Sequence, residues 1–159
     1  MLPIDKNGLV THTGIHAARQ LTIERGDMKI VRGSIVHQTG GSTAASSLES
    51  YKNPRANGAH FLIERDGTIY QTASLYKKAW HVGQLKARCL LEQRCTPVEL
   101  AELKKFNPAA ENRRETGKQP PDRFPSNEDS IGIELVGKAL PHGDSVPPEK
   151  KIYDVVTQQ

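Results

Sequence analysis

Two residues stand out because each lies where a polar side chain is unusual. His37 closes an apolar segment that leads into a glycine-rich turn, and loops at strand ends often carry active-site groups. Glu134 lies inside the apolar run 130–136. If its carboxylate faces the interior, desolvation raises its pKa toward the range of a general base. If it faces solvent, Glu134 is an ordinary strand residue, because side chains alternate between the two faces of a strand.

Three further positions could line a binding groove. Trp80 and His81 are adjacent, and together they could form the wall and floor of a groove that stacks on a sugar or a peptide. Trp80 could equally be a core aromatic whose indole N–H is hydrogen-bonded. His60 begins an apolar segment, and a packed, hydrogen-bonded core histidine is its simplest interpretation. The pair His12 and His16 surrounds Gly14 in a loop or strand, where a solvated pair is commoner than a metal site.

Local patterns predict the elements that hold these residues. The segment 29–37 is rich in β-branched residues and predicts a buried strand. A short helix over 44–52 is expected to start from Ser42 or Thr43 as N-cap. A hairpin is expected from 59–64 through the turn at Asp66 and Gly67 to 69–71. The run 130–136 predicts a further strand, and the pattern from Glu149 onward indicates the start of a helix.

A long polar segment, residues 84–127, separates the hairpin from the last predicted strand. Connections of this length are usually functional insertions or lids. Within it, Thr96 and Glu99 form a capping-box pattern with Pro97 at the first helical position. Cys89 and Cys95 could form one disulfide or remain two free thiols, because spacing alone does not determine their geometry.

Composition excludes several classes of protein. The 159 residues fit one domain and include 36% apolar residues, enough for a core. Only 5% are aromatic and the net charge is +4, so neither a base-stacking platform nor a basic stripe for nucleic acid is expected. No stretch approaches the roughly 20 apolar residues of a membrane span. No signal peptide is recognised at the N-terminus, so we expect a cytoplasmic protein, or one delivered to the periplasm or cell wall by lysis or a secretion system.

Four blocks occur in one order along the chain, and in combination they are specific. The blocks are Val36-His37-Gln38-Thr39, then 58–71 with His60 and the Asp-Gly turn, then Ala79-Trp80-His81-Val82-Gly83, then 127–137 with Glu134. Together they resemble the zinc-dependent N-acetylmuramoyl-L-alanine amidases of the amidase-2 type, whose fold is shared by the peptidoglycan-recognition proteins.

The resemblance implies a single α/β domain with a central mixed β-sheet flanked by helices. That domain would span 29–159 after an N-terminal extension, 1–28. It also implies an amidase that hydrolyses the amide bond between N-acetylmuramic acid and L-alanine of the stem peptide, with peptidoglycan or a muropeptide as partner. His37 matches the family's first zinc ligand, and Glu134 matches the glutamate that activates the attacking water. Trp80 and His81 match the substrate groove, with His60 as a neighbouring, structural position. The insertion would form a groove wall or lid that selects the stem peptide.

The sequence departs from the family pattern in its zinc ligands. The family completes its site with residues beyond the helix that follows the strand of Glu134, whereas this sequence ends at Gln159. The resemblance therefore predicts Zn²⁺ with its remaining ligands beyond Gln159, a chain truncated at its C-terminus, and a further segment of the same protein that completes the fold. His142 and Asp144 are an alternative source of ligands. The alternative function is a non-catalytic muropeptide-binding module without a complete zinc site.

Overall fold

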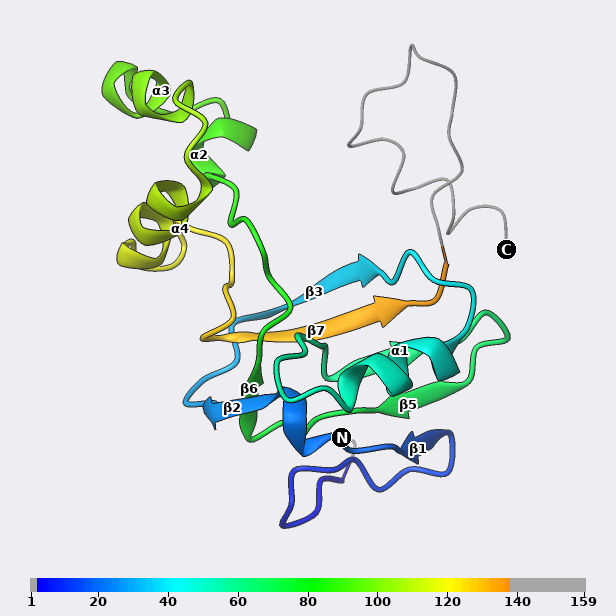
Figure 1. The fold of residues 1–159 in the computed structure, drawn as a ribbon. Coiled ribbons are helices and arrows are strands. Elements are labelled where there is room, and N and C mark those ends of the chain that lie inside the picture. The colour runs from blue at the N-terminus through cyan, green and yellow to red at the C-terminus, as the bar shows by residue number, and fades with distance from the viewer. Residues whose placement is uncertain (1–2, 138–159) are drawn as a thin grey trace.

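The computed structural model describes residues 3–137, and a five-stranded mixed sheet lies at its centre (Figure 1). The strand order is β1-β5-β4-β7-β3. Strands β1 and β5, β4 and β7, and β7 and β3 pair in parallel, whereas β4 and β5 are antiparallel. The five strands are β1 (Ile15–Ala17), β3 (Gly33–Gln38), β4 (Phe61–Ile63), β5 (Ile69–Gln71) and β7 (Ser130–Leu135). A separate pair consists of β2 (Glu24–Asp27), after the 3-10 turn η1 (Leu21–Ile23), and β6 (Lys77–Ala79).

Helix α1 (Ala44–Tyr51) covers one face of the sheet (Figure 1). Of the two N-caps that the sequence offers, Ser42 and Thr43, Thr43 is the one used, and it accepts a hydrogen bond from the Ser46 backbone. The hairpin supports the same end of the helix, because Glu64 Oε2 accepts from the Ala44 backbone N–H at 2.6 Å. Ala44 packs against the fully buried Leu62 of β4, so the polar cap and the apolar face of α1 both meet the hairpin.

The predicted strands form with small changes in their bounds. The hairpin of β4 and β5 is confirmed, and Gly67 at its turn has a φ of +88°, a conformation that glycine adopts without a steric penalty. The predicted strand 29–37 begins later, at Gly33, and the prediction that it is buried is wrong, because β3 lies at the edge of the sheet and none of its residues is fully buried. The first residues of the predicted strand run outside the sheet, where Ile30 and Val31 are about half exposed, so their β-branched side chains do not mark a strand there.

The insertion forms a helical group beyond the end of the sheet (Figure 1). Its helices are α2 (Arg88–Leu91), α3 (Pro97–Leu103) and α4 (Pro108–Gly117). The capping box of Thr96 and Glu99 is confirmed at the start of α3. Helix α3 nevertheless buries no residue, and Phe106 after it is 87% exposed. Helix α4 was missed by the sequence patterns, because its polar residues lack an apolar stripe.

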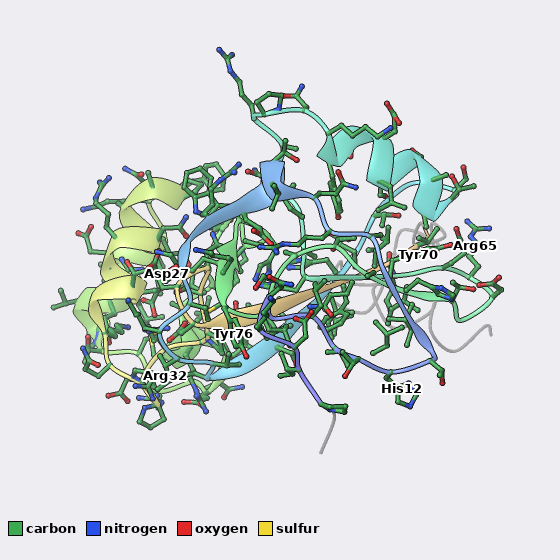
Figure 2. All side chains as sticks on the ribbon, turned by 90° about the horizontal axis from the view of Figure 1, so that it is seen from below. His12, Asp27, Arg32, Arg65, Tyr70 and Tyr76 are labelled. Carbon is green, nitrogen blue, oxygen red and sulfur yellow. A yellow bond between two sulfur atoms is a disulfide. The ribbon has the colours of Figure 1, made fainter. Side chains whose placement is uncertain are left out.

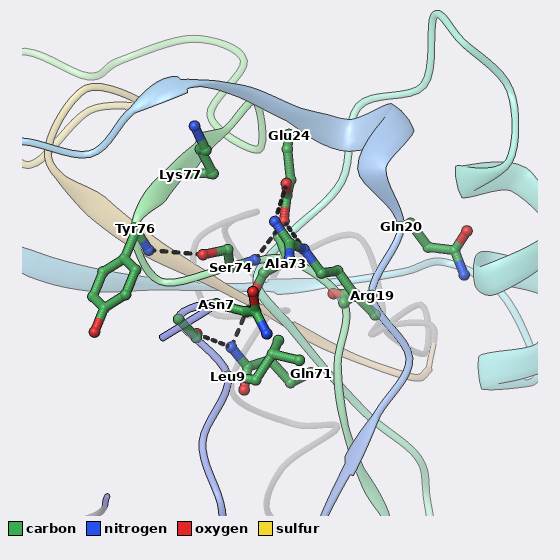
Figure 3. Close-up of polar contacts among 12 residues, drawn as sticks. Asn7, Leu9, Arg19, Gln20, Glu24, Gln71, Ala73, Ser74, Tyr76 and Lys77 are labelled. Atoms are coloured by element: carbon green, nitrogen blue, oxygen red, sulfur yellow. Dashed lines mark hydrogen bonds and ion pairs between the residues drawn. The ribbon is translucent and has the colours of Figure 1, made fainter. Parts of the chain in front are cut away.

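The N-terminal segment is attached to the sheet by buried polar groups (Figure 3). Gln71, at the end of β5, is completely buried. Its side chain accepts from the Val10 backbone N–H at 2.7 Å and donates to the Gly8 carbonyl at 2.8 Å. Glu24 pairs with Arg19 at 2.8 Å and also accepts from the Ser74 backbone at 2.7 Å. Residues predicted as an extension thus contribute a strand, β1, and these contacts to the sheet.

The predicted fold class, α/β with a central mixed sheet in one domain, is confirmed. The predicted boundary at residue 29 stays a prediction, and the helix expected from Glu149 lies outside the described residues. Among residues 3–137, no helix has the length and apolar character needed to cross a membrane.

Cys89 and Cys95 form a disulfide that closes a small loop at α2. Of the two possibilities that the sequence leaves open, the structure selects the bonded one. Cys89 is buried, and the backbone N–H of Arg94 donates to its carbonyl at 2.9 Å. The bridge and this hydrogen bond join the start of α2 to the segment that precedes α3.

Replacing both cysteines with serine is expected to lower the free energy of unfolding by about 2–3 kcal/mol, the usual effect of a short disulfide loop. Denaturant titration of oxidised wild type, reduced wild type and the double variant measures it. Reductant should weaken wild type to the level of the variant and leave the variant unchanged. Two free thiols in protein purified without reductant would contradict the bridge.

Candidate active site

The pairing of β3 with β7 places the two singled-out residues side by side. His37 and Glu134 are direct partners in the parallel register, and Leu62 of β4 is the next partner in the same row. Residues in one row point to one face of a sheet. Because Leu62 packs against α1, His37 and Glu134 face the side of the sheet on which α1 lies.

His81 completes a hydrogen-bonded chain with His37. Ser130 Oγ donates to the Ser126 carbonyl at 2.5 Å, so its only hydrogen is used and it can accept from His81 Nε2 at 3.1 Å. His81 Nδ1 then accepts from His37 Nε2 at 3.2 Å. This network assigns the tautomers, and it leaves His37 Nδ1 as a lone pair without a hydrogen-bond partner among residues 3–137.

Burial keeps these imidazoles neutral. Desolvation lowers the pKa of His37. Desolvation, together with the charges of His60 and His37, lowers the pKa of His81 to about 4. Desolvation is also the main cause of the lowered pKa of His60. At neutral pH each ring therefore has one N–H donor and one lone pair, as a chain of hydrogen bonds or a metal ligand requires.

His60 lies next to the His81 ring, in the core of the protein. It is completely buried, and its Nδ1 accepts from the Gly132 backbone N–H at 3.0 Å while its Nε2 donates to the Lys77 carbonyl at 2.9 Å. Both ring nitrogens are thus bonded to backbone groups. This arrangement agrees with its interpretation as a core histidine, and direct contact of His60 with substrate stays a prediction.

Gly132 and Asn127 hold His81 in place, and sequence reasoning assigned neither of them a role. A Cβ on Gly132 would lie 2.5 Å from His81 Cγ, so only glycine lets the ring rest on β7. Asn127 Oδ1 accepts from the backbone N–H groups of His81 and Val82 at 2.9 and 2.8 Å. Its Nδ2 donates to the Val82 carbonyl at 3.0 Å. Asn127 begins the fourth of the family-like blocks, residues 127–137, and this is the one sequence signal that points to it.

Glu134 has the environment expected of a general base. Its Oε2 is buried and has no hydrogen-bond partner in the described chain, and desolvation raises the pKa of its carboxyl group. Buried polar atoms are rarely left unpaired, so this oxygen is suited to a group that the chain does not supply.

A cavity of about 210 Å³ opens beside Glu134. Trp80 forms part of its lining and is 49% exposed, with the Arg25 guanidinium 4.9 Å from the centre of its ring. A second hollow of about 140 Å³ shares Trp80, Val82 and Gly83 with the first and extends to Asn112 and Thr116 of α4. The first cavity is lined by Tyr51, Asn57, Gly58, Trp80, His81, Val82, Gly83 and Glu134.

The described residues do not form a complete metal site. A neutral histidine with a free lone pair is a suitable ligand, and His37 Nδ1 meets that condition. Residues 3–137 contain no group of three His, Cys, Asp or Glu side chains that could hold a metal. His142 and Asp144 lie outside the described residues. His12, in the N-terminal loop, lies at the edge of the molecule (Figure 2), and His16 packs against the Tyr70 ring.

Comparison with known proteins identifies one family. The Amidase_2 model, described as N-acetylmuramoyl-L-alanine amidase, matches residues 26–158. The chain is also similar to the solution structure of Citrobacter freundii AmpD, with 21% identity over 99% of this chain and 74% of that chain. The TM-score is 0.42. No curated protein is significantly similar to the chain.

Gly132→Ala is expected to displace the His81 ring, because the new methyl group would overlap it. We expect a loss of about 1–3 kcal/mol of stability, the usual cost of overpacking, and a change in the histidine NMR signals as the bond to His37 breaks. Gly41→Ala is the matched control, since its Cβ would meet Thr39 at an ordinary 3.6 Å. Unchanged histidine signals in Gly132→Ala would contradict this packing.

Proposed function

The chain belongs to the N-acetylmuramoyl-L-alanine amidase family, because the family model spans most of its length, and it is a peptidoglycan amidase. On this basis we propose that the cavity beside Glu134 holds the amide bond between N-acetylmuramic acid and L-alanine of the stem peptide. The observation that carries the proposal is the buried, unpartnered Oε2 of Glu134 in the lining of that cavity. Such an oxygen can accept a proton from a water molecule beside the substrate.

In the proposed reaction, water attacks the carbonyl carbon of the amide. Glu134 takes a proton from that water as the new C–O bond forms. It then gives the proton to the nitrogen of L-alanine as the C–N bond breaks, so the products are a carboxylic acid and a free amine. Trp80, half exposed at the cavity, offers an apolar face to the sugar or the peptide.

We propose His37 as one ligand of a catalytic zinc ion, through its free Nδ1. A bound zinc ion would polarise the amide carbonyl and make the attacking water more acidic. Since residues 3–137 supply no complete ligand group, at least one further ligand would come from outside them. The hydrogen bond from His37 Nε2 to His81 fixes the orientation of the ring, as the second nitrogen of a ligating histidine usually does.

The insertion is proposed to extend the groove and select the stem peptide. Helix α4 is attached to the segment that follows His81, because Asn112 donates to the Gly83 carbonyl at 2.8 Å and accepts from the Leu85 backbone at 2.6 Å. The second hollow lies between this helix and Trp80. A peptide that leaves the first cavity past Trp80 would therefore meet residues of the insertion.

The sequence also leaves open a second function, muropeptide binding without cleavage. Zinc content separates the two functions. One equivalent of bound zinc, with hydrolysis lost to a chelator, supports the enzyme, whereas muropeptide binding by a zinc-free protein supports the binding module. The compartment follows from the substrate, which is either a soluble muropeptide in the cytoplasm or the wall itself after delivery by lysis or secretion.

His37→Ala is expected to abolish both zinc uptake and amide hydrolysis. The ratio of zinc to protein should fall from about one to near zero, as elemental analysis after dialysis measures. His12→Ala removes a loop histidine and should retain both properties. Stoichiometric zinc in His37→Ala would show that His37 is not a ligand.

Glu134→Gln keeps the shape of the side chain but cannot accept a proton at neutral pH. We expect turnover of a muramyl peptide to fall by about 10²–10⁴, the usual effect of losing a general base. Zinc content and muropeptide affinity should change little, because the lost interaction belongs to the transition state. Near-wild-type hydrolysis would make Glu134 an ordinary strand residue, and failure to fold would make it a structural one.

A further inference from the structure

Tyr51 ends helix α1 and is placed between the core and the cavity of Glu134. Its ring packs with Ile23 and Ala73, and the residue is only 5% exposed. It nevertheless belongs to the lining of the 210 Å³ cavity, together with Glu134 and Trp80. A buried tyrosine needs a partner for its hydroxyl group, so the surroundings of the phenol decide what it can do.

Two contacts fix the position of Tyr51, one at its backbone and one at its ring. The backbone carbonyl of Tyr51 accepts a hydrogen bond from the Thr22 hydroxyl. Gly58 lies against the other side, where a Cβ would come within 3.0 Å of Tyr51 Cε1 and 2.8 Å of Ile23 Cδ1. The absence of a side chain at Gly58 therefore lets the phenol ring pass beside it toward the cavity.

The hydroxyl group has its proton available for a ligand. Burial, with the charge of Glu134 as a smaller cause, raises the pKa of Tyr51 to about 12, although the Ala59 backbone acts in the opposite direction. The phenol therefore stays protonated at neutral pH and keeps a hydrogen that it can donate to a group in the cavity.

Glu134 and Tyr51 face the same space without bonding to each other. The charge of Glu134 acts on the phenol, yet Glu134 Oε2 has no hydrogen-bond partner within residues 3–137. Because the carboxylate of Glu134 and the phenol of Tyr51 interact electrostatically without a direct hydrogen bond, a third group can lie between them. Glu134 can accept a proton and Tyr51 can donate a hydrogen bond, so the cavity between them suits a reacting amide and the water that attacks it.

We propose that Tyr51 donates a hydrogen bond from its hydroxyl group to the carbonyl oxygen of the scissile amide, where negative charge develops as water attacks. This inference rests on the proposed function and adds a residue to it. A neutral donor in a desolvated cavity stabilises an oxyanion more strongly than the uncharged carbonyl of the bound substrate. The contribution of Tyr51 is therefore to the chemical step and little to substrate affinity.

Tyr51→Phe removes the hydroxyl group and keeps the ring in the core. With a muramyl peptide as substrate, kcat should fall by about 10²–10³, the usual effect of losing one oxyanion donor, whereas KM and the melting temperature stay close to those of wild type. Tyr76→Phe is the matched control, because Tyr76 is 49% exposed, lies at the surface (Figure 2) and is not part of the cavity lining. A kcat of Tyr51→Phe within twofold of wild type overturns the proposal and leaves the amidase function standing.

A second measurement does not require turnover by the enzyme. Ultraviolet titration of the phenols should show a tyrosine with a raised pKa in wild type that is absent from Tyr51→Phe, and Glu134→Gln should lower that pKa. An unchanged titration in Glu134→Gln means that the two groups do not share the cavity, and it overturns the proposal. A zinc-loaded wild type that does not cleave muramyl peptide overturns the proposed function, and the role of Tyr51 with it.

Discussion

The parallel register between β3 and β7 is the constraint on which the site depends. It makes His37 and Glu134 neighbours in one row and directs both toward the face that α1 covers. A shift of one residue would turn one of the two side chains to the opposite face. Two further residues of the same strand position His81. Ser130 forms a hydrogen bond with its ring, and Gly132 leaves room for the ring because it has no side chain. Strand β7 thus provides the proposed base together with the groups that hold His81 beside the proposed ligand.

The site is built from groups that are costly to bury and are therefore bonded. The hydrogen bonds of His60 and His81 end on backbone carbonyls or amides, on Ser130, or on the next imidazole. Three neutral imidazoles can pack together because desolvation suppresses their protonation. The exceptions are His37 Nδ1 and Glu134 Oε2, which have no hydrogen-bond partner among residues 3–137. Unpaired polar atoms of this kind are expected where a substrate or a metal completes the bonding.

The insertion is connected to the site although it contributes little to the core. Helix α3 buries no residue, but Glu111 and Asn112 of α4 bond to the segment that follows His81. Asn127 bonds to the same segment from the other side. The backbone that carries Trp80 and His81 is therefore fixed by side chains from the insertion and from the turn before β7. Through these bonds, the polar and partly exposed insertion helps to determine the shape of the cavity.

Much of this molecule follows from local sequence patterns. The hairpin, the start of α1 at Thr43, the capping box of α3 and the strand of Glu134 were all predictable, because turn geometry, capping and apolar runs act over a few residues. Order and spacing of four blocks were enough to identify the family. Only the tertiary structure decided that His37 and Glu134 are neighbours, that His81 rests on Gly132, and that Tyr51 reaches the cavity. These contacts join residues that are distant along the chain, and they depend on strand register and on the absence of a side chain at single glycines, which no local pattern specifies.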